Sequence, residues 1–135
     1  MLLQEERETV VEYSRKMAES GLCPGTSGNL SILERKSGYV AITPSGMDYM
    51  SLTPEDITVI DLYANVIDGK RKPSSEWALH TEFYKAKPDI SSVIHTHSMY
   101  ACVFAAIGEP LRAVHFIIGA AGSNEIKCAP YALFG

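Results

Sequence analysis

The sequence predicts an α/β fold in which a mixed sheet carries helices on its faces. Segments with helical spacing alternate with short apolar segments, and turn residues alone separate several of the latter, as in hairpins. The chain has 135 residues, which is close to the commonest size of a single domain. No repeat, low-complexity tract or linker interrupts it. We therefore expect one domain over residues 1–135, with a core of its own.

The first half of the chain contains the predicted meander. A helix is expected over residues 4–20, where apolar positions recur at helical spacing and Gly21 follows as a C-terminal cap. A strand near 30–33 is followed by its hairpin partner at 39–43. Thr53 and Pro54 form an N-cap and a first helical position, so a short helix should begin there. Residues 57–62 form the next strand, and 65–67 continue the meander.

The second half alternates between helices and strands. A helix is predicted over residues 76–87, with an apolar face made of Trp77, Leu79, Phe83 and Tyr84, and Pro88 ends it. A buried strand at 92–95, a short apolar helix at 100–107 and a strand at 112–118 follow. The last strand contains His115, which we interpret as a satisfied strand histidine.

Composition and charge exclude several classes of protein. Twelve basic and sixteen acidic residues give a net charge of −4, and the one basic run is residues 70–72, so no nucleic-acid surface is expected. No apolar stretch approaches the roughly 18–20 residues of a membrane span, and the acidic start of the chain does not resemble a secretory signal. The odd count of cysteines, without a Cys-x-x-Cys motif, indicates reduced thiols in a cytoplasmic protein.

A candidate metal site follows the strand at 92–95. His95 and His97 are two residues apart, a spacing that places both side chains on one face of a strand. Imidazole nitrogens are common zinc ligands, and catalytic zinc keeps about three protein ligands and an open position. The pair is therefore either a metal site or two unrelated surface histidines.

A second candidate lies at the start of the predicted helix 76–87. The first N–H groups of a helix lack internal partners and favour an anion, so Ser74 and Ser75 either complete a phosphate site or simply cap the helix. Glu76 is either an acid/base group or metal ligand, or a first-turn carboxylate that complements the helix dipole. His80 is four residues further along the same face, where it either orients Glu76 or is a polar side chain on a partly buried helix.

Two loops of small residues, 25–29 and 43–46, offer a third kind of site. Glycine permits close approach of the backbone to a ligand, and neighbouring N–H and hydroxyl groups suit phosphate oxygens. Neither loop has the Rossmann or Walker A spacing, so nucleotide binding is not expected. Each loop by itself is more often merely a turn.

Taken in order, Gly-Thr-Ser-Gly-Asn, Thr-Pro-Ser-Gly, Pro-Ser-Ser-Glu-Trp and His-Thr-His resemble the class II aldolase/adducin family, and within it the L-fuculose-phosphate aldolases. The resemblance extends through Ala-Val-His at 113–115 to the tail Cys-Ala-Pro-Tyr-Ala-Leu-Phe-Gly. It implies a three-layer α-β-α fold with a central mixed, largely antiparallel sheet. It also implies a cytoplasmic homotetramer of fucose metabolism that binds a sugar phosphate and neither nucleic acid nor membrane.

The resemblance assigns roles at the matching positions. Zn²⁺ would be bound by His95, His97 and, without substrate, Glu76, which would also be the acid/base residue. The substrate phosphate would be held by six residues: Gly28, Asn29, Ser45, Gly46, Ser74 and Ser75. The implied reaction is cleavage of L-fuculose 1-phosphate, or a related deoxy-ketose 1-phosphate, to dihydroxyacetone phosphate and an aldehyde such as lactaldehyde. An L-ribulose-5-phosphate 4-epimerase-like enzyme, which tends to have aspartate at position 76, and a non-catalytic adducin-like interaction module are the alternatives.

The sequence departs from the family pattern at two points. The family's third zinc histidine and closing helices lie beyond the segment that matches the end of this chain, so the domain lacks its C-terminal part. The fuculose-phosphate enzymes typically have tyrosine where this chain has Phe116. Phenylalanine keeps the ring and removes the hydroxyl, which points to a related deoxy-ketose 1-phosphate as substrate.

Overall fold

The computed structural model describes residues 1–133, and the chain divides into two compact units, residues 1–96 and residues 97–135. The first unit contains α1 (Gln4–Glu19), β1 (Asn29–Glu34), β2 (Tyr39–Ile42), the 3-10 turns Tyr49–Ser51 and Pro54–Asp56, β3 (Thr58–Ile60), β4 (Val66–Asp68), α2 (Trp77–Ala86) and β5 (Ser92–His95). The second contains α3 (Met99–Ile107), β6 (Leu111–Arg112), the 3-10 segment Phe116–Ala121 and β7 (Glu125–Ile126). The expectation of a single domain remains a prediction.

The sheet of the first unit has the order β4-β3-β2-β1-β5, and each neighbouring pair is antiparallel. The four strands β1 to β4 form a meander, as predicted from the turn residues between them. Strand β5 arrives after α2 and pairs with the opposite edge of β1, so that Asn29 lies across from His95. This pairing brings two segments distant in the sequence to the same end of the sheet.

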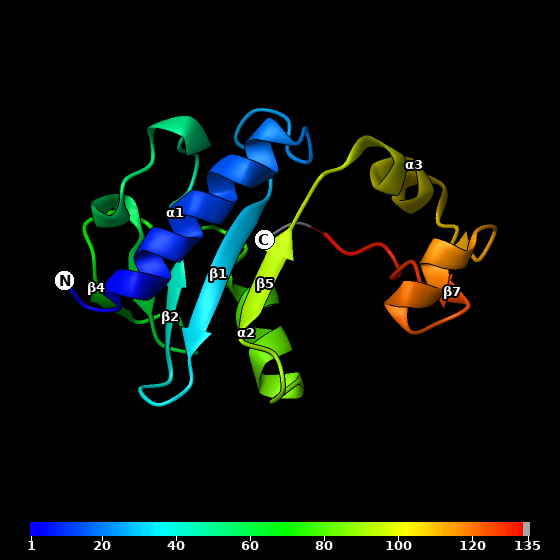
Figure 1. The fold of residues 1–135 in the computed structure, drawn as a ribbon. Coiled ribbons are helices and arrows are strands. Elements are labelled where there is room, and N and C mark those ends of the chain that lie inside the picture. The colour runs from blue at the N-terminus through cyan, green and yellow to red at the C-terminus, as the bar shows by residue number, and fades with distance from the viewer. Residues whose placement is uncertain (134–135) are drawn as a thin grey trace. The chain divides into compact units, whose positions relative to one another are not determined.

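Helices cover both faces of this sheet, and each face has its own core. Leu30 and Ala41 pack with α1 residues on one face, whereas Leu33 and Val40 pack toward Tyr84 of α2 on the other. Figure 1 shows α1 crossing one face of the sheet while α2 lies behind it. The alternation along β1 and β2 follows from the two-residue period of a strand. The predicted α/β fold with three layers is confirmed.

The N-terminal helix is held to the sheet by a buried arginine. Arg7 is 1% exposed and donates from Nε to the Leu2 carbonyl (2.8 Å) and from Nη1 to the carbonyls of Pro54 and Ile57. Its Nη2 lies 2.7 Å from the Asp68 carboxylate at the end of β4. A buried guanidinium is tolerated when its donors are satisfied, and here they join α1 to the segment before β3 and to the end of β4.

Helix α2 departs from the predicted orientation. Leu79 and Phe83 are each 42% exposed, whereas His80, Thr81 and Tyr84 are buried. The inward face is therefore partly polar, because the strand beneath it offers polar partners, as described below. Trp77 packs against the same core as Tyr84, as predicted.

The strand predicted at 112–118 is wrong. Pairing stops after Arg112, whose partner is Glu125, and β7 provides no partner beyond that position. The chain turns instead into the 3-10 segment, where His115 is exposed and its Nδ1 accepts from the Ile117 N–H (3.4 Å). β-branched residues alone do not make a strand without a neighbouring strand to pair with.

Across residues 1–133, none of the helices has the length and apolar character needed to cross a bilayer.

Candidate metal centre

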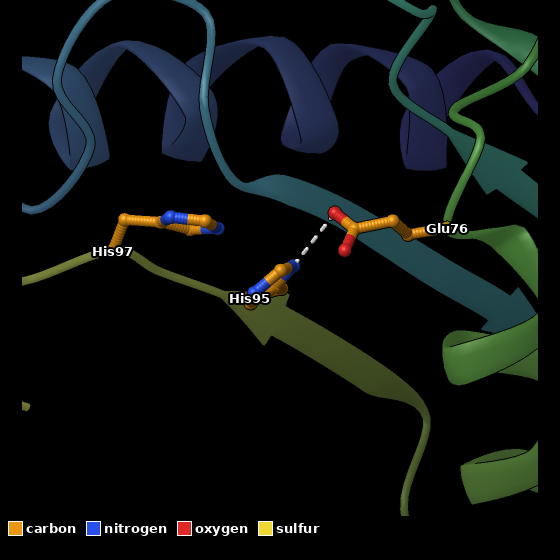
Figure 2. A group of neighbouring side chains, drawn as sticks. All are labelled: Glu76, His95 and His97. Carbon is orange, nitrogen blue, oxygen red and sulfur yellow. Dashed lines mark ion pairs between the residues drawn. The ribbon is translucent and has the colours of Figure 1, made fainter. Parts of the chain in front are cut away.

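Glu76, His95 and His97 converge at one end of the sheet. One ligand atom from each lies within 4.8 Å of the other two, and His95 Nδ1 is 3.0 Å from Glu76 Oε2. Figure 2 shows the Glu76 side chain reaching from the start of α2 toward the two histidines, which lie at and just beyond the end of β5. The pairing of Asn29 with His95 places this strand end next to the start of β1.

The donor set fits a divalent transition metal. Two imidazole nitrogens and a carboxylate oxygen are ordinary ligands of zinc, and ligands about 2.0–2.2 Å from a tetrahedral ion lie roughly 3.3 Å from one another. The observed grouping within 4.8 Å is close to that arrangement. The same donors also suit other first-row metals, so the geometry supports a metal without choosing zinc. The structure brings together all three residues predicted to bind metal.

Asn29 occupies a different setting from the exposed loop in which it was predicted to bind phosphate. It is 4% exposed, its Nδ2 donates to Glu76 Oε2 (2.6 Å), and its Oδ1 accepts from His80 Nε2. The Asn29 amide therefore lies directly beside the Glu76 carboxylate of the candidate metal centre. Its phosphate role remains a prediction, and its observed contacts are with Glu76 and His80.

Thr43 joins the loops that the sequence identified separately. Its hydroxyl accepts from the Leu30 N–H (3.2 Å), and its carbonyl accepts from the Ser74 N–H (3.0 Å). Pro44 and Pro73 form an isolated antiparallel bridge beside it. The loop at 43–46 is thus fixed both to β1 and to the segment that begins α2. Sequence reasoning included Thr43 in a motif but gave it no role.

The residues predicted to hold phosphate differ in accessibility. Ser45, Gly46 and Ser75 are exposed, whereas Ser74 is buried and its Oγ accepts from the Glu76 N–H (3.2 Å). Ser74 therefore bonds the N–H of Glu76, which is itself the N-cap residue of α2 and makes no side-chain capping hydrogen bond, so both interpretations of Ser74 remain predictions. The exposed serines and glycine flank the same helix start, where an anion is favoured.

Gly28 sits at a crowded crossing between the first loop and β5. Its φ is +76°, and a Cβ on it would come within 2.4 Å of Cys23 Sγ and 2.6 Å of the His95 carbonyl oxygen. The buried Tyr49 donates its hydroxyl proton to the Gly28 carbonyl (2.6 Å), and burial raises the pKa of this phenol, so it stays protonated. Glycine is thus required both by conformation and by space. Neither Cys23 nor Tyr49 could be linked to this loop from the sequence.

His80 is fully buried and contacts Asn29, which in turn contacts Glu76 of the candidate metal centre. Burial lowers the pKa of its imidazole to about 4, with His95 contributing in the same direction and Glu76 opposing. The ring is therefore neutral at pH 7, with one nitrogen donating and the other accepting. Its Nδ1 is 2.7 Å from Ser31 Oγ, and Tyr84 lies beyond that hydroxyl.

The chain belongs to the class II aldolase and adducin N-terminal domain family, which matches residues 8–135. It is 50% identical over 135 residues to the 5-deoxy-D-ribulose 1-phosphate aldolase of Bacillus thuringiensis serovar kurstaki, covering 100% of this chain and 63% of that protein. It is 38% identical over 126 residues to the L-fuculose phosphate aldolase of Escherichia coli K12, covering 93% of this chain and 57% of that protein. The chain therefore spans about three fifths of the length of these relatives.

Solved structures agree with this assignment. An L-fuculose 1-phosphate aldolase superposes with a TM-score of 0.93 at 40% identity, covering 99% of this chain and 63% of that one. The L-fuculose-1-phosphate aldolase of Thermus thermophilus shares the fold with a TM-score of 0.75 at 24% identity, covering 97% of this chain and 66% of that one. The predicted family is confirmed, and of the two curated relatives the deoxyribulose phosphate aldolase is the more similar in sequence.

Proposed function

We propose that this chain belongs to a metal-dependent aldolase that cleaves a deoxy-ketose 1-phosphate to dihydroxyacetone phosphate and an aldehyde. The convergence of Glu76, His95 and His97 supports this function best, because a carboxylate and two imidazoles that could hold a metal ion lie together at the end of the sheet. Zinc is the proposed metal, and the family resemblance adds a cytoplasmic homotetramer as the proposed assembly.

The residues divide the chemistry between them. His95 and His97 would hold the cation, which as a Lewis acid would stabilise the negative charge that develops on the substrate when the carbon–carbon bond breaks. Glu76 would carry the proton to and from the substrate carbon, because its carboxylate lies next to the metal ligands. The exposed groups Ser45, Gly46 and Ser75, with Gly28, Asn29 and the buried Ser74 behind them, would fix the substrate phosphate near the start of α2.

The substrate we favour is 5-deoxyribulose 1-phosphate rather than L-fuculose 1-phosphate. The Bacillus relative is named for the former substrate and shares 50% identity with this chain. Phe116 has no hydroxyl with which to bind a polar aldehyde portion of the substrate. The two-carbon aldehyde released from 5-deoxyribulose 1-phosphate carries no hydroxyl group, so it does not need such a partner. Phe116→Tyr should then raise turnover of L-fuculose 1-phosphate relative to 5-deoxyribulose 1-phosphate, and an unchanged ratio would remove this residue from the argument.

Release of dihydroxyacetone phosphate from the two substrates tests the proposal directly. We expect release with added zinc, its loss on chelation, and a fall of about 100-fold or more in Glu76→Gln. Glu82→Gln is the matched control, because Glu82 lies on α2 but is exposed and forms an ion pair with Lys85. Metal-bound protein that releases no dihydroxyacetone phosphate from either ketose would contradict the proposal, and inversion of a ribulose phosphate without cleavage would favour an epimerase.

A further inference from the structure

A ladder of buried polar side chains connects the interior of α2 to the candidate metal centre. The Tyr84 hydroxyl lies 2.7 Å from Ser31 Oγ, which lies 2.7 Å from His80 Nδ1. His80 Nε2 contacts Asn29 Oδ1, and Asn29 Nδ2 donates to Glu76 Oε2 (2.6 Å). The four side chains behind Glu76 are each less than 5% exposed. Water therefore does not compete for the contacts among these four side chains.

The ladder follows from the matching repeats of a helix and a strand. His80 and Tyr84 are four residues apart on one face of α2, and Glu76 lies four residues before His80 as the N-cap, a spacing of about 6 Å along a helix. Asn29 and Ser31 are two residues apart on one face of β1, about 6.8 Å along the strand. Because the two spacings nearly agree, side chains of the helix and of the strand can alternate along one chain of hydrogen bonds. Replacing either polar set by apolar residues would break the sequence of contacts.

The directions of the hydrogen bonds are fixed by the chemistry of the groups. A carboxylate only accepts, so Asn29 must present its NH₂ group to Glu76 and its carbonyl oxygen to His80. That oxygen only accepts, so His80 must carry its proton on Nε2. A neutral ring then accepts at Nδ1, which requires the Ser31 hydroxyl to donate to it. Tyr84 supplies the remaining proton, to Ser31 Oγ or to the Ser31 carbonyl at 2.9 Å.

We propose that His80 is a positioning residue that locks the Asn29 amide so that it donates to Glu76 and thereby fixes this carboxylate for metal binding and proton transfer. A reversed amide would set two acceptors against each other at Glu76 and two donors against each other at His80. The inference rests on the proposed function for the role of Glu76. It extends that function to a residue that contacts neither metal nor substrate, in the way that groups behind a metal ligand commonly hold its orientation.

The test compares two substitutions of similar length and shape. In His80→Gln the amide can still donate to Asn29 Oδ1, whereas in His80→Met the donor is absent; both remove the imidazole that faces Ser31. Cobalt(II) binding to the chain, followed by visible absorption, reports on the site without requiring turnover. We expect His80→Met to weaken cobalt binding about 10- to 100-fold and His80→Gln to stay within about threefold of the unsubstituted chain.

An Asn29→Ala background shows whether the effect passes through Asn29. With the amide removed, the Gln and Met substitutions should bind cobalt equally, because nothing remains for the donor to orient. On the dihydroxyacetone phosphate assay, His80→Met should lower kcat by a larger factor than it raises KM for the ketose. Thermal unfolding of the two variants should be alike, which separates positioning from loss of packing.

Two negative results have different meanings. An unsubstituted chain that neither binds cobalt nor releases dihydroxyacetone phosphate would overturn the proposed function and, with it, the role of Glu76. Cobalt binding that is strong in the unsubstituted chain and equal in the Gln and Met variants would overturn the positioning role of His80 alone. The same holds if the Gln and Met variants still differ after Asn29 is removed.

Discussion

Gly28→Ala tests how tightly the first loop is held against the strand that carries His95. An alanine Cβ at this position would lie 2.4 Å from Cys23 Sγ and 2.6 Å from the His95 carbonyl oxygen, both well inside contact distance. The backbone at Gly28 also has φ +76°, which costs an L-residue about 1–2 kcal/mol. Overpacking of this kind adds about 1–3 kcal/mol. The total expected loss is about 2–5 kcal/mol in the free energy of unfolding.

Gly21→Ala is the matched control, because it isolates the conformational part. Gly21 has a similar φ of +68°, and nothing lies within 4 Å of the place that an alanine Cβ would take. Urea unfolding followed by circular dichroism should therefore show a loss of only about 1–2 kcal/mol for this variant. The difference between the two glycine variants measures the steric overlap at the crossing.

Removing the sulfur divides that overlap further. In a Cys23→Ala background, Gly28→Ala no longer makes the 2.4 Å contact with sulfur, and its distance of 3.6 Å to the Cβ of residue 23 is ordinary. Any loss of stability that Gly28→Ala causes in this background beyond that of Gly21→Ala therefore comes from the His95 carbonyl. Because that carbonyl belongs to His95, a proposed metal ligand, cobalt binding should weaken in both Gly28 variants. Equal stability of Gly28→Ala and Gly21→Ala would refute the reasoning.

Three further predictions concern stability and use the same urea unfolding measurement. Arg7→Met should lower the free energy of unfolding by about 1–3 kcal/mol, because it leaves carbonyls without donors. A loss below about 0.5 kcal/mol would contradict the role of Arg7 in holding α1 to the sheet. Tyr49→Phe should lose about 1 kcal/mol with the hydrogen bond to the Gly28 carbonyl, and an unchanged stability would mean that the bond contributes nothing. For His80, whose pKa is lowered from 6.5 to about 4 by burial, the unfolded chain binds a proton between these values that the folded chain does not. The contribution of neutral, buried His80 to the free energy of unfolding is therefore fully present above pH 6.5. The free energy of unfolding falls by up to about 1.4 kcal/mol per pH unit on acidification toward pH 4, and His80→Met should remove this slope.

The meander and the three-layer arrangement could be predicted because they depend on local patterns. The short apolar segments near 30–33 and 39–43 lie within a short window of the sequence, and the pairing observed is the hairpin expected. The strand at 112–118 could not be judged in this way. Whether β-branched residues form a strand depends on a neighbour, and β7 pairs with only two residues of β6.

The inward face of α2 shows the same limit more clearly. The apolar character of Leu79 and Phe83 predicted that both face the core. In the structure His80 and Thr81 are buried, whereas Leu79 and Phe83 are exposed. What reverses this prediction is Ser31, a strand residue far away in sequence that presents a hydroxyl to the helix. A single sequence does not show which distant residue will face a helix, and so it cannot show that a polar face is the better match.

The three candidate metal ligands could be predicted from the sequence, but the contacts that bring them together and hold them could not. The two-residue spacing of His95 and His97 indicated a shared face, and the helix start drew attention to Glu76. Their meeting, within 4.8 Å, required the pairing of β5 with β1. Asn29 appeared only as a loop residue suited to phosphate, because its contact with Glu76 arises from that same pairing.

The position of β5 in the sheet has a consequence for the order of folding. β1 and β2 close through residues 35–38, whereas β1 and β5 close through residues 35–91, a difference of about 2 kcal/mol in loop-closure entropy. We expect the meander to form early and β5 to dock late, since non-local pairings are the slow ones. Mutations in the hairpin should then slow folding, whereas those along the β1–β5 seam should mainly speed unfolding. Glu76 and His95 would come together only in the last step, when the rest of the first unit is already in place.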